Sequence, residues 1–512
     1  MILSMGTVAQ PQAEQLYAQG LAYHRQGRLD QALAAYEQAL RLQPGYFDVL
    51  HHIGILAWQA GDHGVAEQFL QAALEVDAQV PAAHSNLGNV LKAAGRHEEA
   101  LASYAHALAL DEFHVDAHYN RGNTLQALGR FEAALASYDR AIALQPDDAQ
   151  AWTNRAAVLQ ELRRYDEALH SCASALRVQP DNAEAHWNQA LLHLQHGRFA
   201  EGWRGYEWRW KVEHLSVSRQ YRDFPQPLWL GQQDLAGKTI LLHAEQGLGD
   251  TLQFGRYATM VAARGARVIL EVPRALVKLA QTLAGPAQVL ARGESLPPFD
   301  YHCPLMSLPL AFGSTLDSIP APPAYLHADP GRTAAWNALL GATGKPRVGL
   351  AWSGSQEHGN DHRRSIAFAR LAALLTPACD FISLQNESRA EDAAPLAAST
   401  VRDLGVHLAD FTDTAALCAA MDLVITVDTS IAHLAGALGK PVWLLLGAGP
   451  DWRWLLDRSD SPWYPGMRLV RQQPGEDWSA VLARVRADLD SLVAIRQTGT
   501  ETLLSSLDEP SR

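Results

Sequence analysis

The sequence predicts an α + α/β protein in which an N-terminal α-helical solenoid precedes a pair of α/β domains. Two observations lead to this fold class. Small residues recur every 34 positions over about the first 200 residues, which indicates a helical repeat array. From residue 238 onward, short apolar runs alternate with helical stretches, which is typical of parallel sheets covered by helices.

The composition is that of a globular protein and argues against several classes of protein. The 512 residues carry 42 Lys and Arg against 55 Asp and Glu, so broad affinity for nucleic acid is not expected at a net charge of −13. The N-terminal stretch lacks the pattern of a secretion signal, and no apolar run predicts a membrane span. Because the four cysteines form no CxxC pair, we expect a reduced, cytoplasmic protein.

Phase-locked series of small residues, each with a period of 34, define the repeat array. The first series consists of Gly20, Gly54, Gly88, Gly122, Ala156 and Ala190. The second consists of Ala32, Ala66, Ala100, Ala134, Ala168 and Gly202. Four residues after each member of the second series stand Tyr36, Leu70, Tyr104, Tyr138, Cys172 and Tyr206.

The series predict two antiparallel helices in each unit. Small residues let the helices approach closely, the large residue fills the gap, and glycines such as Gly27 turn the chain. The pattern resembles the tetratricopeptide repeat and covers residues 13–216 in six units. This resemblance implies a right-handed superhelix whose concave groove binds peptides or other proteins, with units that stack and do not fold alone.

The sixth unit departs from the others in the string Gly202-Trp-Arg-Gly-Tyr-Glu-Trp-Arg-Trp210. Its three tryptophans carry more apolar area than a solvent-facing cap would. We expect this unit to dock onto the next domain, with ligand stacking as the alternative. A proline-rich linker over residues 217–235 then marks the domain boundary.

The pattern of apolar runs predicts two α/β domains, over residues 236–335 and 345–490, followed by a tail over residues 491–512. In the first domain, strands at 238–245 and 267–272 flank a tight loop at 246–250 and a helix at 251–263. The strands expected in the second domain span residues 345–352, 380–384, 422–427 and 441–446. Because such sheets bind ligands at the carboxyl ends of their strands, we expect the active site in a cleft between the domains.

The strongest chemical signal is the string Asp428-Thr-Ser-Ile-Ala-His433, which directly follows a predicted strand. Asp428, Thr429 or Ser430 can cap the next helix, whose first-turn amides and positive dipole end would bind an anion. His433 lies one turn into that helix and faces the cleft if the cap does. The alternative is an ordinary capped helix with a hydrogen-bonded histidine.

A second signal lies in the first strand-to-helix turn. Gly247 and Gly249 let backbone amides approach a substrate, and Asp250 can take a proton from an attacking hydroxyl. The alternative is that Asp250 only stabilises the helix terminus. A nicotinamide site with Glu271 as the ribose ligand ranks lower, because Leu252 stands where the dinucleotide fingerprint requires glycine.

The third signal is a polar, glycine-rich loop over residues 353–365 that carries Arg363 and Arg364. Guanidinium groups bind diphosphate oxygens in bidentate pairs, although a solvated basic loop is equally consistent. His358 and His362 have the spacing of a helical metal pair. The glycine and asparagine between them argue against a helix, so no metal site is expected.

Taken together, the three strings resemble those of heptosyltransferase-type glycosyltransferases of family nine, with the best match over residues 422–446. The resemblance implies two Rossmann-like domains (the GT-B fold), a nucleotide-diphosphate sugar as co-substrate, no further cofactor, and usually inversion without a metal. The residues that match its acceptor-activating base, its donor-binding set and its phosphate contacts are Asp250; Asp428, Thr429, Ser430 and His433; and Arg363 or Arg364. The family's basic loop usually offers lysine, where this chain has arginine.

Tetratricopeptide repeats joined to a GT-B transferase are similar to the architecture of O-linked N-acetylglucosamine transferases. That similarity is one of architecture alone, and it implies a polypeptide acceptor in the solenoid groove. The sequence leaves a glycan or lipid-linked saccharide acceptor open. A hypothesis of a different class is a protein-interaction scaffold whose transferase-like half is inactive.

Overall fold

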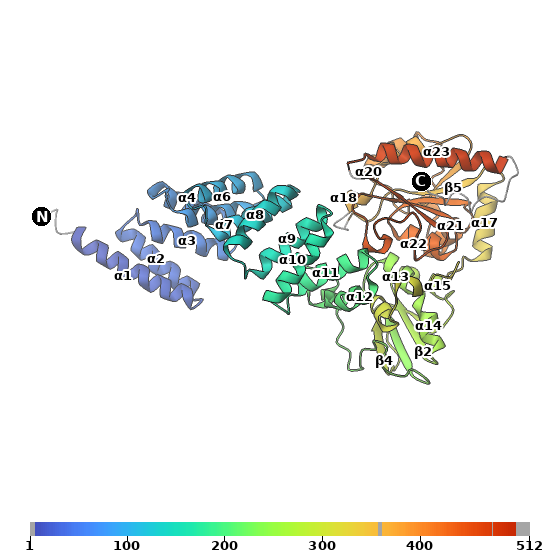
Figure 1. Cartoon of the computed structure of the whole chain (residues 1–512), viewed down its shortest axis with the longest axis horizontal. Coiled ribbons are helices and arrows are strands. Elements are labelled where there is room, and N and C mark those ends of the chain that lie inside the picture. Colours follow the sequence, from blue (N-terminus) through green and yellow to red (C-terminus); the bar gives the residue numbers. More distant parts are fainter. Residues whose placement is uncertain (1–5, 357–360, 474, 498–512) are drawn as a thin grey trace. The chain divides into compact units, whose positions relative to one another are not determined.

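The computed structural model describes residues 6–356, 361–473 and 475–497. The chain divides into two compact units, Met1–Gln189 and Ala190–Arg512 (Figure 1). Within the described residues, none of the helices is both long enough and apolar enough to cross a membrane.

The first unit is a stack of helix pairs that follow one another along the chain (Figure 1). The helices are α1 (Gly6–Arg25), α2 (Leu29–Leu42), α3 (Phe47–Gln59), α4 (His63–Val76), α5 (Pro81–Ala93), α6 (His97–Leu110), α7 (Val115–Ala127), α8 (Phe131–Leu144), α9 (Ala149–Glu161) and α10 (Tyr165–Val178). The next helix, α11 (Ala183–Gln195), continues into the second unit. The expected helical solenoid is therefore confirmed.

Glycine sets the spacing of the two helices within a repeat. A Cβ added to Gly122 would lie 2.6 Å from Cε1 of Tyr138, and one added to Gly88 would lie 2.5 Å from Cε1 of Tyr104. Both distances are far below ordinary van der Waals contact, so the tyrosine ring occupies the space of the missing side chain. The turn glycines, such as Gly27 with φ of 71°, adopt the left-handed conformation that the repeat requires.

A ring-to-carbonyl hydrogen bond recurs at the start of four repeats. The Nε2 atom of His84 lies 3.0 Å from the carbonyl oxygen of Ala78, six residues earlier, and the carbonyl can only accept. The indole N–H of Trp152 donates to the carbonyl of Pro146 at 3.0 Å in the equivalent place. The other two bonds of this kind are made by His118 and His186. These bonds fix each inter-repeat turn to the helix that follows it.

The second unit contains a parallel four-stranded sheet with the order β3-β2-β1-β4. Its strands are β1 (Thr239–His243), β2 (Arg267–Val272), β3 (Pro286–Ala291) and β4 (Tyr301–Pro304). The α-helices between its strands are α13 (Leu248–Phe254), α14 (Tyr257–Ala263) and α15 (Val277–Ala280), and α16 (Leu308–Ala311) follows β4. We call this part the four-stranded domain. The chain reverses its direction of strand addition between β1 and β4, which is where such sheets bind ligands.

The single helix expected over residues 251–263 is wrong in two respects. Residues 248–250 already belong to α13, because the Asp250 carboxylate accepts the Gly247 N–H and closes a cap at Gly247. The helix then breaks at Gly255, a residue of low helix propensity. Beyond the break, the Arg256 side chain donates to the carbonyls of Pro320 and Trp463. A separate helix, α14, begins at the next residue.

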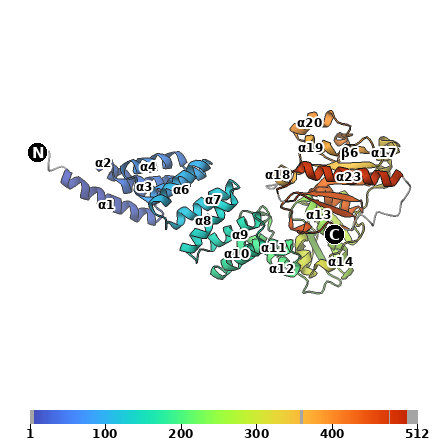
Figure 2. The same ribbon diagram turned by 45° about the horizontal axis from the view of Figure 1, so that its top comes forward.

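A parallel five-stranded sheet with the order β6-β5-β7-β8-β9 completes the second unit. Its strands are β5 (Arg347–Ala351), β6 (Asp380–Ser383), β7 (Leu423–Val427), β8 (Val442–Leu446) and β9 (Met467–Arg471). Its helices are α17 (Pro330–Leu340), α18 (Asp361–Arg364), α19 (Phe368–Leu371), α20 (Ala390–Ala397), α21 (Phe411–Ala419), α22 (Ser430–Ala437) and α23 (Trp478–Gln497). We call this part the five-stranded domain. Its last helix, α23, packs on α19 and β9, and Figure 2 shows α23 next to α19.

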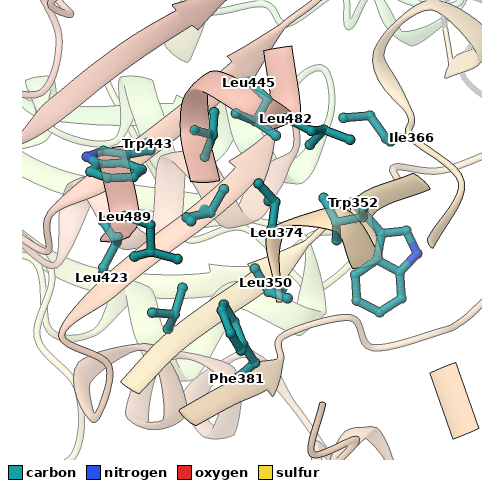
Figure 3. Packing of buried hydrophobic residues seen from close by; sticks show 14 of the residues in the cluster. Leu350, Trp352, Ile366, Leu374, Phe381, Leu423, Trp443, Leu445, Leu482 and Leu489 are labelled. Carbon is teal, nitrogen blue, oxygen red and sulfur yellow. The ribbon is translucent and has the colours of Figure 1, made fainter. Parts of the chain in front are cut away.

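The core of the five-stranded domain lies between the sheet and the helices on one face (Figure 3). Leu350, Phe381 and Leu445 project from the strands, and Leu482 and Leu489 of α23 pack into the same cluster. The strands β7 and β8 are buried along their whole length, as expected for parallel strands covered on both faces. The tail expected after residue 490 begins as the end of α23, and residues from 498 onward lie outside the described part of the chain.

The last helix of the repeat array, α12 (Phe199–Tyr206), packs within the second unit. The Trp203 ring lies 5.2 Å from the ring of Trp452 and 6.4 Å from that of Phe254, and its N–H donates to the carbonyl of Ser314 at 3.0 Å. Only 1% of Trp203 is exposed. The expected docking of this helix onto the next domain is therefore observed, and Trp203 is unavailable for stacking on a ligand.

Candidate functional site

The carboxyl ends of β1 and β7 lead into two helices that touch at their N-termini. The loop after β1 enters α13, and the loop after β7 enters α22. A Cβ added to Gly249 would lie 2.8 Å from Cδ2 of His433 and 3.6 Å from Cα of Ser430. Only glycine permits this approach. Gly249 therefore lets the loop at residues 246–250, which we call the Gly-Asp loop, lie against α22 of the other domain, the helix predicted to bind the donor.

Asp250 lies in the first turn of α13 and is held on both carboxylate oxygens. Its Oδ2 accepts the Gly247 N–H at 3.0 Å, and its Oδ1 pairs with the guanidinium of Arg453. One fifth of the side chain remains exposed. Because an ionised carboxylate offers about four lone-pair sites, these two bonds leave sites for a further donor.

Arg453 is a site residue that the sequence did not reveal. It lies in a short 3₁₀ turn, Trp452–Trp454, in the loop that follows β8. Its Nε donates to Oε1 of Gln253 and its Nη1 to Oδ1 of Asp451, both at 2.8 Å. Burial opposes its charge, but the carboxylates of Asp451 and Asp250 outweigh burial and raise the pKa of the guanidinium above its ordinary value.

The N-terminus of α22 is capped by Thr429. Its Oγ1 accepts the N–H of Ile431 at 3.3 Å, and Ser430 is the first helical residue. The backbone carbonyl of Asp428 accepts Nη1 of Arg364 at 2.8 Å. Burial, together with the Asp451 carboxylate nearby, raises the pKa of the half-buried Asp428 side chain to about 6.

His433 is packed and hydrogen-bonded. Its Nδ1 lies 2.9 Å from the Tyr464 hydroxyl, and its ring stacks on that of Trp454 at a centroid distance of 5.4 Å. Burial and the guanidinium of Arg453 lower the pKa of His433 well below its ordinary value, so the ring is neutral at pH 7. This environment matches the alternative of a hydrogen-bonded core histidine, and donor binding by His433 remains a prediction.

The two arginines of the basic loop differ in position. Arg364 lies against Gly354, where an added Cβ would be 2.6 Å from its Nη2, and it points to the end of β7. Arg363 is exposed. Of the two histidines considered as a metal pair, His362 is exposed and His358 lies outside the described residues.

A buried ion pair supports the other end of the Gly-Asp loop. Arg209 is fully buried and donates to both carboxylate oxygens of Glu245, at 3.0 and 3.1 Å, and to the hydroxyl of Ser307 at 2.8 Å. Burial raises the pKa of Glu245 to about 7, although Arg209 acts against this. Glu271, which a nicotinamide site would use, is buried in an ion pair with Arg222.

A shallow hollow of about 430 Å³ lies elsewhere in the second unit, between the start of α17, α21 and α22. It is lined by Leu326, His327, Ala328, Pro330, Thr333, Ala334, Asn337, Ala419 and Leu438. None of the predicted site residues is among them. The candidate site is therefore defined by the contact between α13 and α22 and by the arginines around it.

Family models match two separate parts of the chain. Models of the tetratricopeptide repeat match residues 20–61, 47–80, 88–129, 115–148 and 153–202. The model of glycosyltransferase family 9 (heptosyltransferase) matches residues 381–463, which include α22 and Arg453.

Individual proteins are similar to parts of the chain. Protein FlbA of Caulobacter vibrioides is 32% identical over 324 residues, which cover 58% of this chain and 53% of FlbA. The chain thus spans about half the length of that relative. Human tetratricopeptide repeat protein 7A is 30% identical over 86 residues, or 17% of this chain and 10% of the human protein.

Among solved structures, Pseudomonas aeruginosa PilF superposes with a TM-score of 0.37 and 18% identity, covering 41% of this chain and 93% of PilF. The peptide-binding tetratricopeptide repeat protein YrrB gives a TM-score of 0.30 and 22% identity, covering 33% of this chain and 88% of YrrB. On the evidence of the family models, the chain carries tetratricopeptide repeats in its N-terminal region and a glycosyltransferase family 9 (heptosyltransferase) domain in its C-terminal region.

Proposed function

We propose that the chain transfers a sugar from a nucleotide-diphosphate donor to an acceptor hydroxyl, with inversion at the anomeric carbon. The observation that carries this proposal is the contact of Gly249 with Ser430 and His433. It joins the loop that bears Asp250 to a helix N-terminus inside the segment that matches glycosyltransferase family 9. A candidate base and a candidate diphosphate site therefore lie side by side.

In the proposed reaction, Asp250 accepts the proton of the acceptor hydroxyl as that oxygen attacks the anomeric carbon. The bond from this carbon to the diphosphate breaks, and its electron pair stays on the phosphate oxygen. A single displacement of this kind inverts the configuration. The exposed fifth of the Asp250 side chain supports the role of the base, because the acceptor must reach it.

The charge that develops on the departing diphosphate needs fixed positive groups. The first-turn amides of α22 at Ser430 and the positive end of its dipole can supply them. Arg364, bonded to the backbone of Asp428, adds a guanidinium group beside this terminus. Arg363, its exposed neighbour in α18, is a second candidate for a phosphate contact. We propose that these groups stabilise the leaving group without a metal ion.

The solenoid would present the acceptor. Tetratricopeptide repeats in other proteins bind polypeptides, and a polypeptide acceptor or a protein partner in the groove is the assignment that we favour. A glycan acceptor bound by the four-stranded domain alone is the competing assignment. Deletion of residues 1–182 separates the two assignments. If the solenoid presents a polypeptide acceptor, the deletion abolishes transfer. If the four-stranded domain binds a glycan acceptor, the deletion leaves transfer intact.

Asp250→Asn tests the base. We expect this change to lower sugar transfer by about 10²- to 10⁴-fold, because amide oxygen is a poor proton acceptor. The variant should still be stabilised thermally by the nucleoside diphosphate that stabilises the unsubstituted chain. Asp317→Asn, at an exposed carboxylate in a short helical turn, is the matched control and should transfer sugar normally. Full transfer by Asp250→Asn would remove Asp250 from the mechanism.

Removal of metal ions tests the proposed stabilisation of the diphosphate. Because the helix terminus and the arginines are fixed in the protein, we expect transfer to be unchanged in excess EDTA. Loss of transfer in EDTA, with recovery on addition of Mg²⁺ or Mn²⁺, would contradict this part of the proposal.

A scaffold with an inactive transferase-like domain is the alternative. A panel of UDP-, GDP- and ADP-linked sugars separates the two functions, since a scaffold releases sugar from none of them. The same panel of nucleoside diphosphates, measured by thermal shift, reports which nucleotide binds. An NAD-dependent rise in the melting temperature would instead favour the nicotinamide alternative.

A further inference from the structure

A single guanidinium joins the four-stranded domain to the five-stranded domain at Asp250. Arg453 comes from the loop after β8, whereas Asp250 and Gln253 stand three residues apart on the same face of α13. We propose that Arg453 is a positioning residue that orients the Asp250 carboxylate for proton transfer. This inference rests on the proposed function.

The contacts of Arg453 suit a guanidinium and no other side chain. Three of its nitrogen atoms donate to three different acceptors, on Asp250, Gln253 and Asp451. The guanidinium carbon, Cζ, lies over the Trp452 ring, 4.3 Å from its centroid. A lysine ammonium is a point charge without this planar fork and can satisfy only part of the set.

The loop that carries Arg453 is itself held in place. The indole N–H of Trp463 donates to the carbonyl of Arg453 at 3.1 Å, and Nη1 of Arg471 donates to the carbonyl of Leu455 at 3.1 Å. Leu455 has a φ of 56°, a left-handed conformation that is strained for a leucine. Such strain persists where surrounding contacts over-determine the backbone, and it accumulates near functional sites.

These contacts fix the orientation of the carboxylate. The last torsion of an aspartate side chain is soft, because the sp³–sp² bond has broad minima. With Gly247 on Oδ2 and Arg453 on Oδ1, the plane of the group is set and its remaining lone pairs point in defined directions. Because the two partners come from different domains, the base is fully oriented only when the domains are in contact.

The test is a double-mutant cycle on the full chain with the nucleotide sugar that the panel identifies. We expect Arg453→Gln to lower kcat about 10²-fold, the scale of a misplaced catalytic group, with unchanged affinity for the nucleoside diphosphate. In the Asp250→Asn background the same change should have no further effect on kcat, because Arg453 acts through Asp250. Arg453→Lys keeps the charge and loses the planar fork, so its kcat should fall between that of the unsubstituted chain and that of Arg453→Gln.

Arg256→Gln is the control for lost packing. Arg256 is also buried and donates to the carbonyl of Trp463 and the hydroxyl of Tyr325. None of its hydrogen bonds in the described residues goes to Asp250. We expect a lower melting temperature in this variant with kcat retained by the folded fraction.

The outcomes separate this inference from the proposed function. Three results would overturn the role of Arg453 and leave the proposed function standing. The first is an equal loss of kcat from Arg453→Gln with and without Asp250→Asn. The others are a normal kcat in Arg453→Gln or Arg453→Lys, and a loss of nucleotide affinity in place of kcat. If the unsubstituted chain releases sugar from no donor, the proposed function fails, and the inference fails with it.

Discussion

At the scale of single residues, two glycines act through the side chain that each lacks. Gly122 makes room for the ring of Tyr138 inside a repeat, and Gly249 makes room for His433 between the two domains of the second unit. The same absence therefore serves packing in one place and the candidate site in the other. Neither glycine has a positive φ, so steric space rather than backbone freedom requires them.

Gly122→Ala tests the steric argument. An added Cβ would lie 2.6 Å from the Tyr138 ring, so we expect a loss of about 1–3 kcal/mol in the free energy of unfolding. Gly64→Ala is the control, because its Cβ would meet only Asp62 Oδ1, at 3.7 Å, near the start of α4. In that exposed helical position, alanine should stabilise by about 0.5–1 kcal/mol. Urea unfolding followed by circular dichroism measures both changes, and equal signs would contradict the steric explanation.

The sequence predicts those site residues that belong to a local pattern. Asp250 could be selected because a carboxylate directly after Gly-x-Gly in a strand-to-helix turn is a local signal. Arg453 could not, because its partner lies 203 residues earlier and only the folded chain brings them together. The rule that ligands bind at the carboxyl ends of parallel strands would have drawn attention to the loop after β8.

At the scale of elements, the strands that escaped prediction share a position. The strands β1, β2 and β5 to β8 follow from apolar runs in the sequence. The strands β3, β4 and β9 were not predicted, and all three lie at the edges of their sheets. An edge strand needs no continuous apolar run: β3 is half-exposed along most of its length, and β9 carries half-exposed arginines at two of its five positions. The break between α13 and α14 was missed because its cause, the bonds of Arg256 to distant carbonyls, is tertiary.

Asp410→Ala tests how one cap anchors an element. The Asp410 side chain accepts the N–H groups of Thr412 and Asp413 at the start of α21 and pairs with Lys278 from the four-stranded domain. Partial burial alone would raise its pKa, but the hydrogen bonds from Lys278 and Thr412 hold the pKa of Asp410 well below its ordinary value. We expect the substitution to cost about 1–2 kcal/mol at pH 7.

The pH dependence of that cost follows from the direction of the shift. A carboxyl group with a lowered folded-state pKa stabilises the fold above its unfolded pKa, and this stabilisation is lost as the pH falls. The difference between the unsubstituted chain and Asp410→Ala should therefore shrink below about pH 4. Lys278→Ala should cost less than Asp410→Ala, because this exposed ion pair contributes little. A difference independent of pH would contradict the assignment to the ionised carboxylate.

At the scale of the whole molecule, the last repeat helix and the short turn after it belong physically to the second unit. Trp203 packs against Trp452 and Phe254, and Arg209 is the buried partner of Glu245. The sequence could predict that the last repeat unit docks through its tryptophan-rich end, because so much apolar area is not left in solvent. It could not identify Arg209 as the partner of Glu245, since that pair forms between segments 36 residues apart.

Two fragments test this assignment. A fragment of residues 183–512, which begins with the whole of α11, should be soluble, unfold cooperatively and bind the same nucleoside diphosphate as the full chain. A fragment of residues 212–512 should be insoluble or partly unfolded, because it leaves the site of Trp203 empty and Glu245 buried without Arg209. Size-exclusion chromatography and circular dichroism distinguish them, and normal folding of the shorter fragment would contradict this view.

The inclusion of α12 in the second unit has a practical consequence for the architecture. The helices that precede it follow a 34-residue period, and none of them carries a residue of the predicted site. We therefore expect that an array with more or fewer repeats can be joined ahead of α11 with the second unit unchanged. In engineering terms, α12 is the fixed junction, and the number of repeats ahead of it is the part that can vary.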